Sequence, residues 1–211
     1  MQLQVNKITN LQIACGRIDR LVIAPGERFS LWHLVGRPTA RRGYLDGLVL
    51  DAGRIRAGVG GGLCQLGNLL YWMLIQTPLT VTERWRHGYD VFPDVNRRLP
   101  FGSGATLSYN YVDLGFENRT TEHWQIRLGL DATHLHGAIR CQAPCRYDYR
   151  IEETDHHVRP EWWGGYTRHN RIWREIEDRQ TGEIRRELVT ANHAIMMYEP
   201  LLPESPIPSH P

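Results

Sequence analysis

The chain has 211 residues, enough for one domain with a substantial hydrophobic core and no need of covalent cross-links. Hydrophobic residues make up 41% and charged residues 23%, which excludes an intrinsically disordered chain. The formal net charge is only +2, and 25 basic residues are scattered among 23 acidic ones, so no nucleic-acid partner is expected.

Targeting signals are absent from the sequence as it stands. No apolar run approaches the roughly 20 residues that a membrane-spanning helix needs, so no transmembrane segment is expected. Residues 1–7 lack the apolar core of a secretory signal peptide, which predicts a cytoplasmic protein, or an extracytoplasmic one if the chain is exported by another route. Four cysteines are too few to predict a disulfide framework.

The first 58 residues are interpreted as short strands and turns with little helix. Residues 21–24 predict a strand, residues 25–27 a turn, and residues 29–32 a second strand. Residues 45–50 and 53–56 predict another strand and its turn.

The pattern changes to a helical one after Val59. Apolar or small side chains recur at the spacing of one buried helix face: Leu66, Leu69, Leu70, Met73 and Thr77. Pro78 is expected to end this helix. Cys64 therefore belongs to the first helical turn, directly after the three glycines Gly60, Gly61 and Gly62.

Strand signals return beyond this helix. Residues 105–111 and 124–130 alternate between apolar and polar side chains, with a turn at 117–120, and predict a hairpin. Residues 147–151 indicate a further strand, and residues 171–191 a charged hairpin around 180–183. Five of the 12 prolines lie at or after Pro200, which predicts an extended or disordered tail over 200–211.

Cys64 carries the strongest chemical signal. A helix N-terminus is expected to lower the pKa of a thiol, and the N–H groups around Cys64 to hold a developing oxyanion. Gly60, Gly61 and Gly62 leave the backbone uncovered for a substrate, and Gln65 adds a side-chain donor. A small buried cysteine in a tight turn is the structural alternative. Phosphate binding is disfavoured because the lysine and Ser/Thr of a P-loop are absent.

His87 lies 23 residues after Cys64 and is the candidate general base (87 − 64). Asp90 and Asp113 are both candidates to orient its second ring nitrogen, and the sequence leaves that choice open.

A rival site combines His134 and His136 with Cys141 and Cys145. Four N/S ligands suffice for tetrahedral zinc, but the spacing matches no strong zinc signature, so no metal and no cofactor are expected.

Several motifs occur together in one order. They are 25–30 (PGERFS), Val35-Gly36, 42–44 (RGY), 60–65 (GGGLCQ), Glu83-Arg84 with His87, and 113–118 (DLGFEN). On these motifs the chain resembles the VanW family, which is named for an accessory protein of vancomycin-resistance gene clusters. Residues 162–200 are similar to its stand-alone type. Three departures stand at Gly67-Asn68, at Gly88 after His87, and at residues 102–105, where an acid of the family pattern is missing.

The resemblance implies a cysteine acyltransferase of the L,D-transpeptidase kind, acting on peptidoglycan stem peptides or their precursors. Cys64, His87 and Asp113 would then be catalytic, and Gly60–Gly62, Gln65 and Arg84 would bind substrate. The alternative is a non-catalytic peptide-binding module that supports glycopeptide resistance.

We expect an α+β fold in which a mostly antiparallel, barrel-like sheet carries one main helix with Cys64 at its N-terminus. Residues 1–199 are expected to form a single domain, with a motif-rich part at 13–118 and a strand-rich extension at 119–199. Residues 200–211 would be a proline-rich tail. The oligomeric state is left open.

Overall fold

The computed structural model describes residues 2–51, 54–91, 93 and 99–200. The predicted tail thus lies, apart from Pro200, outside the described residues. Within the described ranges no helix is both long and apolar enough to cross a membrane.

Over residues 2–51 and 54–58 the structure has the strands predicted near 21–24, 29–30 and 45–50, but it has more helix than expected. Helix α1 spans Gln2–Ile18, α2 spans Leu31–Val35, and a 3-10 turn spans Ala40–Arg42. Leu11, Ala14, Cys15 and Ile18 are buried in α1 at the spacing of one helix face. That face is short and lies among polar residues, so burial against the rest of the protein, more than local propensity, accounts for this helix.

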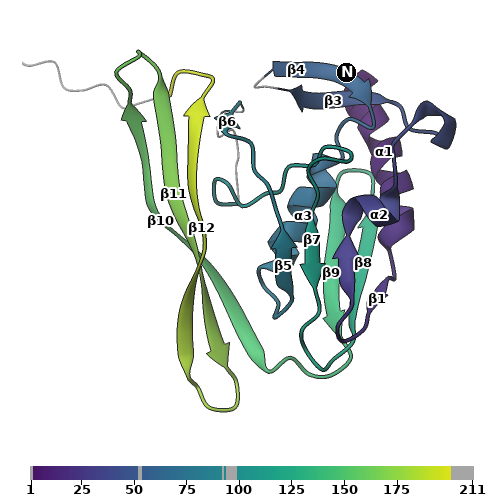
Figure 1. Ribbon diagram of the computed structural model, residues 1–211, viewed down its shortest axis with the longest axis vertical. Coiled ribbons are helices and arrows are strands. Elements are labelled where there is room, and N and C mark those ends of the chain that lie inside the picture. The colour runs from purple at the N-terminus through teal and green to yellow at the C-terminus, as the bar shows by residue number, and fades with distance from the viewer. Residues whose placement is uncertain (1, 52–53, 92, 94–98, 201–211) are drawn as a thin grey trace, which may run out of the picture.

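The body of the protein holds three small antiparallel sheets beside these helices (Figure 1). Strands β1 (Val22–Ile23), β8 (Trp124–Leu130) and β9 (Leu135–Cys141) form one sheet, in the order β1-β8-β9. Strands β2 (Arg28–Ser30), β7 (Gly115–Glu117) and β5 (Thr80–Glu83) form the second, in the order β2-β7-β5. Strands β3 (Asp46–Asp51) and β4 (Arg54–Val59) form a hairpin.

A fourth, taller sheet stands beside the body (Figure 1). It is ordered β10-β11-β12-β6 and consists of β10 (Tyr147–Pro160), β11 (Tyr166–Asp178), β12 (Ile184–Met196) and β6 (Tyr89–Asp90). The predicted charged hairpin is confirmed as β11 and β12, which are longer than expected. The α+β class and the mostly antiparallel pairing are confirmed as well.

One predicted strand is wrong, and the strand predicted at 29–32 is confirmed only for its first two residues, which belong to β2. Residues 105–112 make isolated bridges, Trp85 to Thr106 and Ser108 to Val112, and β8 pairs with β1 and β9 instead. Residues 29–32 change from strand to helix because the Ser30 hydroxyl accepts a hydrogen bond from the His33 N–H (3.1 Å) and caps α2.

Helix α3 (Cys64–Leu74) is the centre of the core. Leu66, Leu70 and Leu74 are fully buried along one face of α3, within the main hydrophobic cluster. Because α3 is packed along its length, its first residue, Cys64, has a fixed position.

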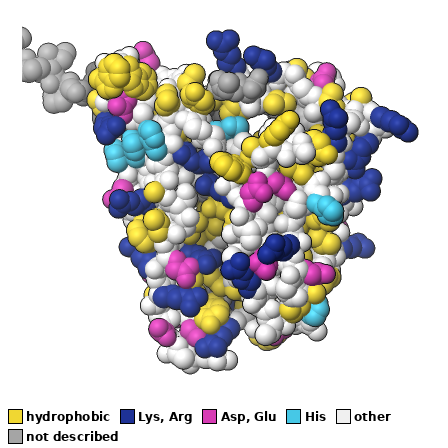
Figure 2. Space-filling view, in the orientation of Figure 1, with side chains coloured by type: hydrophobic (Ala, Val, Ile, Leu, Met, Phe, Trp, Pro, Cys, Tyr) yellow, Lys and Arg dark blue, Asp and Glu magenta, His cyan; other side chains and the backbone are white. Residues whose placement is uncertain are grey.

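Figure 2 shows acidic and basic side chains interspersed over one face of the molecule.

Candidate active site around Cys64

Cys64 is the first residue of α3, as the sequence predicted. Its side chain is partly exposed, and its thiol lies 3.7 Å from the carbonyl oxygen of Leu107, which accepts a hydrogen bond from it. Among the described residues, the hydrogen bond of this thiol goes to Leu107 rather than to His87. The segment that contains Leu107 therefore lies next to the start of α3.

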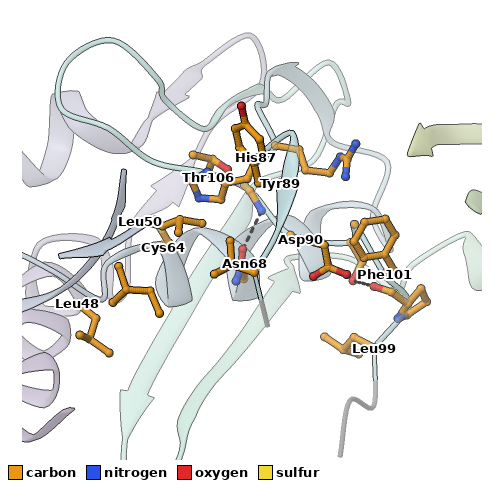
Figure 3. Close-up of a pocket in the computed structure, with 18 of the residues that line it drawn as sticks. Leu48, Leu50, Cys64, Asn68, His87, Tyr89, Asp90, Leu99, Phe101 and Thr106 are labelled. Carbon is orange, nitrogen blue, oxygen red and sulfur yellow. Dashed lines mark hydrogen bonds between the residues drawn. The ribbon is translucent and has the colours of Figure 1, made fainter. Parts of the chain in front are cut away.

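Cys64 and His87 line the same cavity, whose volume is about 370 Å³ (Figure 3). Its apolar wall is formed by residues of the β3–β4 hairpin and of the segment around residue 100: Leu48, Leu50, Ile55, Leu99 and Phe101. Asn68, Arg86 and Asp90 are polar residues of the same cavity. On its other side, Cys64 borders a second groove of about 470 Å³, which residues 107–111 also line. Cys64 thus borders two spaces that are large enough for part of a short peptide.

The electrostatics of the pair differ from the sequence expectation. Burial raises the pKa of the Cys64 thiol above its ordinary value of 9.0, although the thiol's backbone hydrogen bonds act in the opposite direction. Burial, with the Arg86 guanidinium nearby, lowers the pKa of His87. Both shifts favour a neutral thiol and a neutral imidazole at pH 7. The expected lowering of the thiol pKa by the helix N-terminus is therefore outweighed by desolvation.

The three glycines are packed closely against other elements, and they also line the groove of about 470 Å³ that Cys64 borders. A Cβ on Gly61 would lie 2.2 Å from the carbonyl carbon of Gly47 in β3, and one on Gly62 would lie 2.3 Å from Cγ of Lys7 in α1. Gly60 has φ +79°, and its Cβ would lie 2.6 Å from Pro38. Their missing side chains let α3 begin where two other elements cross.

Gln65 and Arg84 are not among the residues that line the cavity of Cys64 and His87. Gln65 faces a small groove on the side of α1, shared with Gln4 and Lys7, because successive helical residues point about 100° apart. Arg84 is largely buried over the ring of Tyr71, 4.5 Å from its centroid. Its guanidinium donates to the carbonyl oxygens of Gly102 and Gly104, and therefore holds the loop that lines the cavity.

The two candidate orienting acids are separated by the fold. Asp113 accepts hydrogen bonds from the Ser30 hydroxyl and the Trp32 N–H, so its carboxylate holds the start of α2 and does not line the cavity of His87. Asp90 lines that cavity, but its carboxylate is buried and pairs with Arg168 at 3.3 Å and with the Tyr198 hydroxyl at 2.8 Å.

The alternative zinc site is divided between the two ends of β9. His136 is near its start and Cys141 is its last residue. Five residues of strand separate them by roughly 17 Å, at about 3.3 Å per residue, too far for one metal ion. His136 pairs instead with Asp131 in the preceding turn.

Sequence reasoning missed Asn68 and the loop that holds it. The Ala105 N–H donates to Oδ1 of Asn68 at 2.9 Å, and a Cβ on Gly104 would lie 2.3 Å from the same oxygen. Two of the three departures from the family pattern are therefore in contact with each other. The i, i+4 spacing of Cys64 and Asn68 on one helix was the signal in the sequence.

By its fold and its site, this is an α+β protein in which a cysteine at the start of a helix and a histidine line one cavity. A family profile described as "VanW like protein" matches residues 6–140. The chain is 35% identical over 182 residues to the vancomycin B-type resistance protein VanW of Enterococcus faecalis, covering 86% of this chain and 66% of that protein. The chain belongs to the VanW family.

A second relative is the uncharacterized protein YoaR of Bacillus subtilis, 32% identical over 118 residues. That alignment covers 56% of this chain and 37% of YoaR. The chain therefore spans just under two thirds of the first relative and little more than a third of the second. No solved structure shows significant similarity.

Proposed function

We propose that this protein is a cysteine acyltransferase that acts on peptidoglycan stem peptides or their precursors and contributes to resistance to vancomycin-type antibiotics. The observation that carries the proposal is that Cys64 and His87, 23 residues apart in the chain, line one cavity. The link to resistance comes from the name of the Enterococcus faecalis relative.

The proposed reaction needs three events at this cavity. His87 accepts the thiol proton as Cys64 attacks the carbonyl carbon of a stem-peptide amide. The leaving amine takes the proton back from His87, and the peptide remains on Cys64 as a thioester. An amine acceptor or water then releases it. A neutral imidazole is the form that can accept a proton, and the lowered pKa of His87 keeps it in that form at neutral pH.

Intact-mass analysis after incubation with a purified muropeptide tests the proposal. The wild type is expected to gain the mass of the acyl group, and Cys64→Ala to gain none. Cys64→Ser should be nearly inactive, because a hydroxyl is a much weaker nucleophile unless its base is tuned to it. His87→Ala should slow acylation by roughly two to four orders of magnitude. A wild type that forms no adduct, together with full resistance from Cys64→Ala in cells, contradicts catalysis.

A non-catalytic peptide-binding module is the second candidate, and one observation favours it. Burial raises the pKa of the Cys64 thiol, and a buried protonated thiol is what a structural cysteine has. In that case Cys64→Ala binds the muropeptide as tightly as the wild type does, since alanine fills most of the space of cysteine. Calorimetric titration of both proteins with the muropeptide separates the two functions.

A further inference from the structure

Three of the backbone donors at the start of α3 are already used. The Gln65 N–H donates to the carbonyl oxygen of Gly62, and the Leu66 N–H donates to that of Leu63, both at 3.0 Å. The Gly67 N–H also donates to Leu63, at 3.2 Å. These three N–H groups of the first turn are therefore satisfied, so beyond the N–H of Cys64 itself a substrate carbonyl needs a donor from elsewhere.

Asn68 is placed to supply that donor. It lies four residues after Cys64 on the same face of α3, and side chains on a helix lean toward its N-terminus, here toward Cys64. Both residues line the cavity that contains His87, and Figure 3 shows both facing it from α3. The side chain of Asn68 is itself exposed to this cavity.

The amide of Asn68 has a defined orientation. The Ala105 N–H can only donate, so the atom that it contacts at 2.9 Å must be the amide oxygen. The NH₂ group lies on the opposite branch, and within the described part of the chain no protein acceptor takes its hydrogen atoms. Arg84 holds the carbonyl oxygen of Gly104, at 2.7 Å from Nη2 and 2.9 Å from Nε, and thereby fixes the partner of the amide.

Gly104 is part of the same arrangement. A Cβ at this position would lie 2.3 Å from Oδ1 of Asn68 and 2.8 Å from its Cγ. A side chain at residue 104 and an Asn68 amide in this orientation therefore exclude each other. The Ala105 N–H fixes the Asn68 amide by a hydrogen bond, and the absence of a side chain at Gly104 leaves room for that amide.

We infer that Asn68 is a further catalytic residue, whose Nδ2 donates a hydrogen bond to the substrate carbonyl oxygen as Cys64 attacks. The inference rests on the acyl transfer proposed above. The sulfur–carbon bond forms, the carbonyl electron pair moves onto oxygen, and that oxygen accepts the Nδ2 hydrogen. When the carbonyl re-forms, the carbon–nitrogen bond breaks and the amine departs with the proton from His87.

The test is single-turnover acylation of Cys64 by a muropeptide, followed by intact mass at several muropeptide concentrations. Asn68→Asp keeps the oxygen that Ala105 needs and removes the donor. Removing one such donor costs about 10²- to 10³-fold in rate, so the maximal acylation rate should fall by that factor while apparent affinity changes less than about threefold. Gln65→Glu is the matched control, since it makes the same amide-to-acid change at a residue of α3 that lines a different groove.

Gly104→Ala is the second variant, because it displaces the amide without changing Asn68. It should slow acylation while the melting temperature shows that the protein remains folded. Maximal rates of Asn68→Asp and Gly104→Ala within about threefold of the wild type, as the control Gln65→Glu should show, overturn the role of Asn68 and leave the proposed function intact. A wild type that forms no adduct overturns both.

Discussion

Gly47 and Gly61 are in close backbone contact, and an added methyl group there should lower the free energy of unfolding strongly. Gly61→Ala would place a Cβ 2.2 Å from the carbonyl carbon and 2.3 Å from the carbonyl oxygen of Gly47. Carbon atoms in contact are normally about 3.5–4.0 Å apart, so β3 and the start of α3 would have to separate by more than 1 Å. Both sides of the contact are backbone, and no flexible side chain can move away.

Overpacking costs typically about 1–3 kcal/mol, and a backbone contact of this kind belongs at the upper end or above it. At roughly 2–4 °C per kcal/mol for a chain of this size, a loss of about 3 kcal/mol lowers the melting temperature by about 6–12 °C. The separation also moves Leu48 of β3, which lines the cavity of Cys64. The substitution should therefore change the reactivity of the thiol as well.

Thermal and urea unfolding, followed by circular dichroism, measure this loss. Gly16→Ala is the matched control: Gly16 lies inside α1, nothing is within 4 Å of its added Cβ, and alanine is the better helix former by about 0.5–1 kcal/mol. The two variants should therefore shift stability in opposite directions. If Gly61→Ala unfolds within about 0.5 kcal/mol of the wild type, the glycines are not needed for the crossing, and an opening for substrate becomes the better explanation.

The remaining predictions concern thiol reactivity, two buried arginines and metal. Because burial raises the pKa of the Cys64 thiol, iodoacetamide at neutral pH should label the exposed Cys145 before Cys64. The labelling rate of Cys64 should still increase with pH above pH 9. Mass spectrometry of the labelled peptides measures both rates, and faster labelling of Cys64 than of Cys145 contradicts the raised pKa. Asp90→Ala removes one carboxylate partner of the buried Arg168 guanidinium, which should cost about 1–3 kcal/mol in urea unfolding, and an unchanged stability would refute the importance of the pairing. Arg84→Lys cannot reach both loop carbonyls in the same way, so it should lose about 1–3 kcal/mol and label faster at Cys64; unchanged labelling would show that the loop does not depend on Arg84. A chelator should leave the melting temperature unchanged, and stoichiometric zinc by elemental analysis would contradict the separation of its ligands along β9.

The sequence by itself determined those elements whose signal is local. The glycines followed by Leu66, Leu69, Leu70 and Met73 located α3 and put Cys64 at its start, because a helical period is written in consecutive residues. The charged hairpin of β11 and β12 was equally evident from its two alternating strands and their turn. The family motifs gave the membership that the comparisons show.

Tertiary structure decided what depends on partners far away in the chain. Helix α1 has few apolar residues and becomes a helix because Leu11, Ala14 and Ile18 are buried by other elements. Residues 105–111 alternate like a strand, yet their backbone bridges to Trp85 and lies over α3, where Ala105 and Leu107 make contact with Asn68 and Cys64. Alternation reports which side chains can share a face, but it does not choose the pairing partner.

The same distinction applies to the site. Sequence reasoning identified Cys64 and His87 by residue type, and the fold placed both at one cavity. It assigned Gly61 to substrate approach, Asp113 to His87 and a lowered pKa to the thiol. The structure adds a chain crossing at Gly61, a helix start held by Asp113 and desolvation of the thiol, which depend on the segments that are neighbours in space and not on the residues adjacent in the chain.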